Sequence, residues 1–67
     1  MNKLKERRTE VGLTQGALAI EAGLPPELVC RYERGLRSNQ PNARRLAKAL
    51  QSDVTALFPD YETLRTY

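Results

Sequence analysis

The stretch that decides the fold is residues 13–35, which read LTQGALAIEAGLPPELVCRYERG. Two short helical patterns follow each other in this stretch, with Gly23 between them. The apolar side of the first pattern, residues 15–22, consists of Leu18, Ala19 and Ala22. Because a helix of about two turns cannot bury all of its faces, we expect each helix to keep one face in solvent.

The second pattern starts at the Pro25–Pro26 pair and ends at Gly35, with Val29 and Tyr32 on its inward face. Proline suits the first turn of a helix, because the N–H that it lacks would have no partner there. The solvent face of this helix offers Pro26, Glu27, Cys30, Arg31 and Arg34. Two helices joined by a short glycine turn are the signature of a helix-turn-helix, whose second helix enters a DNA major groove.

A set of short motifs in this order spans most of the chain. They are Leu13-Thr14-Gln15, Leu18-Ala19, Ala22-Gly23-Leu24, Tyr32-Glu33-Arg34-Gly35, Leu46-Ala47-Lys48-Ala49-Leu50 and Val54…Leu57-Phe58, with Arg8 and Gly12 before them. The set resembles the helix-turn-helix of the Cro- and phage-repressor-type family, the XRE-like regulators, over roughly Leu4 to Phe58. The resemblance implies an all-α, compact five-helix domain of the lambda-repressor-like kind, with the helix-turn-helix formed by helices 2 and 3.

The segments on either side predict the three remaining helices. Residues 2–11 form a thin amphipathic helix with Leu4 and Val11 on its inward face, and Gly12 falls where a left-handed cap is expected. Thr14 is the expected N-cap of the next helix. The fourth helix opens at Pro41 and runs to Leu50, and a short fifth helix follows Asp53, its expected N-cap.

The length of 67 residues predicts one domain, residues 1–58, followed by a tail, residues 59–67. In the tail, Tyr61, Leu64 and Tyr67 are spaced for a last helical turn that docks on the body or on a second subunit. A frayed end is the alternative. The loop near Asn39 to Pro41 and the segment from Val54 onward are, by family likeness, the expected dimer contacts.

The single cysteine excludes an internal disulfide and suits a reducing cytoplasm. No apolar run approaches the roughly 18 residues of a membrane span, and no secretion signal is visible. We therefore expect no membrane association and a cytoplasmic protein, encoded by a bacterium or a phage. The sequence has no histidine, no metal-ligand cluster and no phosphate-cradling glycine loop. We therefore expect that the protein is not an enzyme and that it binds no metal or cofactor.

Positive charge is concentrated in the body of the chain, because residues 1–50 hold ten Lys and Arg against five Glu. Such a surface suits a polyanion, although a merely soluble basic surface gives the same count. The resemblance places Pro26, Glu27 and Arg31 against base edges, with Cys30 at the margin. Glu27 either accepts a hydrogen bond from cytosine N4 or repels the wrong sequences. A pair within the helix with Arg31, four residues on, is an equally sensible role for Glu27.

Other residues are expected to hold the DNA backbone. Gln15 lies at a helix N-terminus, where exposed amides favour an anion. The remaining phosphate contacts expected from the sequence are Arg34, Arg37, Ser38 and Asn39. The resemblance also implies a partly buried salt bridge between Arg8 and Glu33 that fixes the recognition helix.

These observations predict a sequence-specific transcriptional regulator, a repressor or Cro-like protein, that binds double-stranded DNA as a homodimer. The alternative is an antitoxin-like or accessory module that binds a protein partner through its helical body and tail. Ile20, Leu28 and Leu36, apolar where relatives are usually polar, would belong to such a patch. Scattered exposed apolar residues are otherwise normal.

Overall fold

A computed structural model of the chain describes residues 2–59, and these fold into helices without any strand. The five helices are α1 (Leu4–Val11), α2 (Gln15–Ala22), α3 (Pro26–Glu33), α4 (Gln40–Ala49) and α5 (Val54–Leu57). The predicted all-α fold with a helix-turn-helix in α2 and α3 is confirmed. The three tail residues that were expected to dock, Tyr61, Leu64 and Tyr67, lie outside the described residues.

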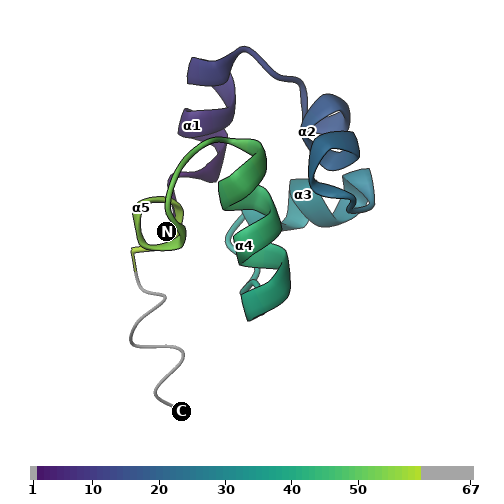
Figure 1. The fold of residues 1–67 in the computed structure, drawn as a ribbon. Helices are drawn as coiled ribbons and strands as arrows, with labels where there is room; N and C mark the ends of the chain where they lie inside the picture. The colour runs from purple at the N-terminus through teal and green to yellow at the C-terminus, as the bar shows by residue number, and fades with distance from the viewer. Residues whose placement is uncertain (1, 60–67) are drawn as a thin grey trace.

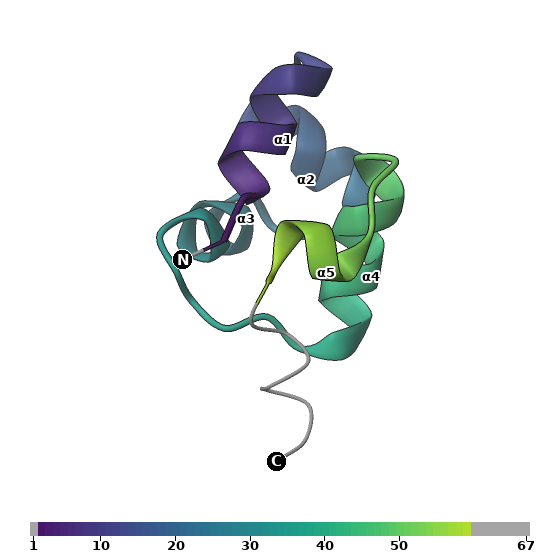
Figure 2. The same cartoon turned by 90° about the vertical axis from the view of Figure 1, so that its left-hand side faces the viewer.

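Helix α4 stands in the middle of the molecule, with α5 on one side and the α2–α3 pair on the other (Figure 1). It packs against α2 and α5, while α3 packs against both α2 and α1. A view turned by 90° shows α1 above α3 and α5 (Figure 2). The recognition helix therefore rests on its neighbours along one side only.

One apolar core joins all five helices. Its buried members are Leu4, Leu18, Ala19, Ala22, Val29, Tyr32, Ala43, Leu46, Ala47, Leu50, Leu57 and Phe58. Every inward-facing residue predicted for α2 and α3 is among them, whereas Ala49 of α4 is only partly buried. Ala43 of α4 is an additional core residue, one turn before the buried Leu46 and Ala47.

The prediction for the inward face of α1 is wrong at Val11. Leu4 is fully buried, but Val11 is 43% exposed. The reason is the length of the helix relative to the core, since the C-terminal turn of α1 projects beyond the helices beneath it (Figure 2). Two residues on the same face of a helix are therefore not necessarily buried to the same extent.

The helix ends follow local chemistry. The backbone of Gly12 is left-handed, with φ of 87°, and the Thr14 hydroxyl accepts the N–H of Ala17 at 3.0 Å. Helix α4 begins one residue earlier than predicted, because Asn39 caps it by accepting the N–H of Asn42 at 2.9 Å. Asp53 occupies the N-cap position of α5, but its side chain makes no capping hydrogen bond.

Two glycines of α2 make opposite demands on the backbone. Gly23 ends the helix in the left-handed region, with φ of 71°, which an L-residue adopts only at a cost. Gly16 lies within the helix, and a Cβ built there meets no atom within 4 Å. Gly23 is therefore required by the turn, whereas Gly16 is not required by space or by backbone angle.

We expect Gly16→Ala to raise the free energy of unfolding by about 0.5–1 kcal/mol, because alanine is the better helix former. Gly23→Ala should lower it by about 1–2 kcal/mol through left-handed strain. Thermal unfolding followed by circular dichroism measures both, since about 1 kcal/mol shifts Tm by roughly 4–8 °C in a domain of this size. Shifts of the same sign in the two variants would contradict this account of the turn.

Candidate nucleic-acid interface

An ion pair between α1 and α3 fixes the second helix of the motif. Arg8 Nε donates to Glu33 Oε2, and Arg8 Nη2 donates to Glu33 Oε1 at 3.2 Å. The third guanidinium nitrogen, Nη1, donates to the carbonyl of Leu13 at 2.8 Å. Gln15 Nε2 completes the Arg8–Glu33–Gln15 network by donating to Glu33 Oε1 at 2.9 Å. This network ties together α1, the loop after it, the start of α2 and the end of α3.

The network is shielded from water, because the side chains of Arg8 and Glu33 are only 11% and 4% exposed. Burial raises the pKa of the Glu33 carboxyl. Hydrogen bonds from Arg8 and Gln15, with the positive charges of Arg8 and Lys5, lower that pKa by more, so it lies below the ordinary value of 4.5. Glu33 is therefore held as a carboxylate in the folded protein.

Tyr32 anchors the same end of α3 to two other parts of the chain. It is only 3% exposed, and its hydroxyl accepts a hydrogen bond from Asn42 Nδ2 of α4 at 2.8 Å. Its carbonyl accepts one from Asn2 Nδ2 at 2.7 Å. Sequence reasoning missed Asn2 and Asn42, because no local pattern links residues 10 and 30 positions away from Tyr32.

The residues expected to face bases lie along the outer side of α3. Pro26, Glu27 and Arg31 are exposed, and Cys30 is half-buried. Glu27 and Arg31 do not pair with each other, since the ion pairs among residues 2–59 involve only Arg7 with Glu10 and Arg8 with Glu33. The Arg31 guanidinium is thus available to a partner.

The expected phosphate contacts divide into two groups. Arg34 and Arg37 are exposed in the loop after α3. Gln15 and Asn39 also make hydrogen bonds within the fold. Gln15 donates to Glu33, and Asn39 caps the N-terminus of α4. Ser38, which is half-buried, donates its hydroxyl hydrogen to the carbonyl of Asn39 at 3.0 Å. Their contacts with DNA stay predictions.

The arginines are divided by position along the chain. Arg7 donates to the carbonyls of Leu50 and Gln51 at 3.0 and 3.3 Å, where a cation suits the C-terminal end of α4. Arg7 and Arg8 of α1 are therefore engaged within the fold. From α3 onward, residues 26–52 hold six Arg and Lys against two Glu, one of which is Glu33, already paired.

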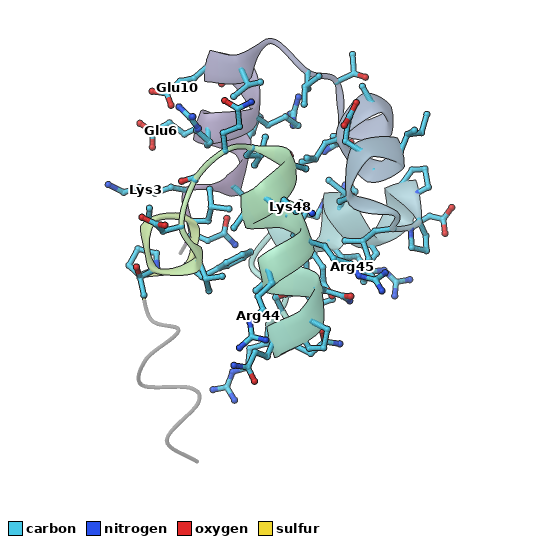
Figure 3. All side chains as sticks on the ribbon, in the orientation of Figure 1. Lys3, Glu6, Glu10, Arg44, Arg45 and Lys48 are labelled. Atoms are coloured by element: carbon cyan, nitrogen blue, oxygen red, sulfur yellow. The ribbon has the colours of Figure 1, made fainter. Side chains whose placement is uncertain are left out.

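Three of those six cations lie on α4 and were not assigned a role from the sequence. They are Arg44, Arg45 and Lys48, all exposed (Figure 3). Their spacing within one helix was visible, but the direction of each relative to α3 depends on how α4 packs. The sequence therefore indicated how many positive charges this helix carries, but not which surface of the domain they occupy.

Two helices at a glycine turn, with an exposed second helix bordered by free arginines, define a helix-turn-helix nucleic-acid interface. A family model described as helix-turn-helix matches residues 4–57. No curated protein and no solved structure gives a significant match. The chain belongs to the Cro- and phage-repressor-type, XRE-like helix-turn-helix family of DNA-binding regulators, and the resemblance seen in the sequence is confirmed. Within residues 2–59, no helix combines the length and apolarity needed to cross a bilayer.

Breaking the ion pair should destabilise the fold severely. Glu33→Gln keeps the shape of the side chain but leaves the largely shielded Arg8 charge unpaired. We therefore expect this variant to lower the free energy of unfolding by roughly 3 kcal/mol. Urea unfolding measures the change, with the exposed Glu21→Gln as the matched control. A loss no larger than that of the control would mean that the pair does not brace α3.

The same variant should change the response to acid. Because the pKa of Glu33 is lower in the folded chain than in the unfolded one, its contribution is complete above the ordinary value of 4.5. It is lost as the pH falls through the folded pKa. Below about pH 5 the wild type should therefore lose stability more steeply than Glu33→Gln. Urea midpoints that fall in parallel for the two proteins would contradict this.

Proposed function

We propose that this chain is a sequence-specific transcriptional regulator of the repressor or Cro type, with α3 in the major groove. The observation that carries the proposal is Arg31, which is exposed and unpaired in the last turn of a braced helix. A helix of eight residues gains its orientation from its neighbours, and the Arg8–Glu33–Gln15 network supplies that bracing. Arg31 therefore meets DNA from a fixed direction.

Direct readout in this proposal rests mainly on Arg31. Its planar fork matches guanine O6 and N7, a contact worth about 1–3 kcal/mol of discrimination. Glu27 lies one turn earlier and accepts from cytosine N4 or repels other bases at that position. Pro26 offers apolar contact alone, and Cys30, half-buried beside them, reaches only the margin of the interface.

Phosphate contacts would fix the register of α3 in the groove. Arg34 and Arg37 extend from the loop after α3, and Gln15 lies at the exposed N-terminus of α2. Backbone amides and the helix dipole at that terminus favour an anion. Ser38 and Asn39 complete this set at the loop, where Asn39 also caps α4.

One recognition helix reads only a few base pairs, so we propose that two copies bind a pseudo-palindrome. The two α3 helices would lie about 34 Å apart, one helical turn of DNA. A selection of bound sequences from random duplex DNA tests binding, symmetry and spacing together. We expect inverted half-sites with centres about 10 base pairs apart. Recovery of unrelated sequences without a repeated half-site would refute specific binding by a dimer.

Two arginine variants separate readout from positioning. Arg31→Ala should relax the preference at one base pair of each half-site and cost roughly 1–3 kcal/mol there. Arg37→Ala, its matched control, should weaken all sequences alike and lower the salt slope by about one. Titrations of the selected duplex and of single-base variants measure both. Uniform losses in both variants would refute direct readout by Arg31.

A protein-interaction module is the competing function, and the exposure of two apolar side chains favours it. Ile20 is 82% exposed on α2, and Leu36 is 46% exposed. Leu28 contributes little to such a patch, because it is partly buried against the core. The salt dependence of binding distinguishes the two functions, because phosphate contacts release counterions and groove binding therefore weakens steeply as salt rises. Binding to the selected duplex that ignores salt would favour the protein-interaction module.

A further inference from the structure

Arg45 of α4 has no assigned partner in the part of the chain that the structure describes. Its side chain is exposed, and no hydrogen bond or ion pair among residues 2–59 uses its guanidinium. Figure 3 shows Arg45 on the side of α4 that faces α2 and α3, whereas Arg44 leaves the other side. Neighbouring arginines of one helix therefore face different surroundings.

The Arg45 guanidinium lies against the turn of the helix-turn-helix. Its Nη1 is 3.9 Å from the position that a Cβ on Gly23 would occupy. Gly23 comes three residues before Pro26, so the cation lies where the chain enters the recognition helix. A shallow groove of about 320 Å³ between α2 and α4, lined by Arg45, Lys48 and Glu21 among others, keeps this cation accessible.

Capping of α2 does not account for this placement. The carbonyls of Ala19 and Ile20 already accept hydrogen bonds from the N–H groups of Leu24 and Gly23, at 2.9 and 3.2 Å. Glu21 lines the same groove but forms no ion pair with Arg45. An exposed, unpaired cation at the entrance to α3 is instead suited to an anion outside the protein.

The positions of Arg45 and Arg37 relative to α3 indicate whether the two cations would bind the same anion. An eight-residue helix is about 12 Å long, and a major groove is about 12 Å wide. Arg37 lies beyond the C-terminal end of α3, and Arg45 lies beside its N-terminal end. If α3 occupies the groove, the two cations are therefore too far apart to share one phosphate.

We propose that Arg45 is a further positioning residue, which contacts a phosphate of the DNA backbone beside the N-terminal end of α3. The inference rests on the proposed function, because it requires α3 to lie in the major groove. One phosphate contact releases about 0.9 counterion, so Arg45→Ala should weaken binding about fivefold at 0.15 M salt. It should also lower the slope of log K against log salt by about one.

The test uses the duplex recovered by the selection, titrated at several salt concentrations with the full chain. Arg45→Ala is compared with Arg44→Ala, which removes the same charge from the same helix on its other side. Arg45→Lys keeps the charge and should restore most of the affinity. Thermal unfolding of each variant shows that the fold is kept, and ethylation interference identifies the phosphate that is lost.

The inference holds if Arg45→Ala loses about one more unit of salt slope than Arg44→Ala, together with a phosphate that Arg37→Ala retains. It is overturned if the two α4 variants have equal slopes, or if Arg45→Ala keeps the wild-type interference pattern. Failure of the proposed function looks different, because the wild type itself would then show no salt-dependent binding to any duplex.

Discussion

The partly buried ion pair between Arg8 and Glu33 is the constraint on which the rest of the structure depends. A helix as short as α3 is not stable alone, and its apolar contribution to the core is limited to one side. The ion pair has two further hydrogen-bonding neighbours, the Leu13 carbonyl and Gln15, so that it links α1, α2 and α3 in this arrangement. Because leaving either charge unpaired is costly, the pair sets the direction of the recognition helix.

The same physical chemistry separates two uses of positive charge in a small protein. On α1, Arg7 and Arg8 donate hydrogen bonds to backbone carbonyls and to Glu33, and these bonds stabilise the fold. From α3 to α4 the cations lie exposed and unpaired, where repulsion between them gains the fold nothing. A phosphate backbone would remove that repulsion, which is why the interface and the basic surface coincide in the proposed function.

Errors in the sequence-based predictions fall where one residue faces two competing demands. Val11 shares a helical face with Leu4, but the core ends before it, so periodicity overstated its burial. Asn39 was expected to contact a phosphate, and its side chain has a structural role that was not expected, because it caps α4 by accepting the N–H of Asn42. Asp53 has the right residue type and position for a cap yet makes no capping bond. Periodicity predicts which way a side chain points but not how deeply it is buried. Residue type predicts a preference for a cap position but not the group that the side chain binds.

The sequence by itself determined the five helices, the glycine turn and most of the core, because these depend on spacing and local backbone chemistry. It also determined the exposed side of α3, since Val29 and Tyr32 leave only one face for Arg31. Tertiary structure alone decided which cations are free, which amides hold Tyr32, and where Arg45 lies relative to Gly23. Those facts join residues far apart in the chain, and only the packing of the helices fixes such distances.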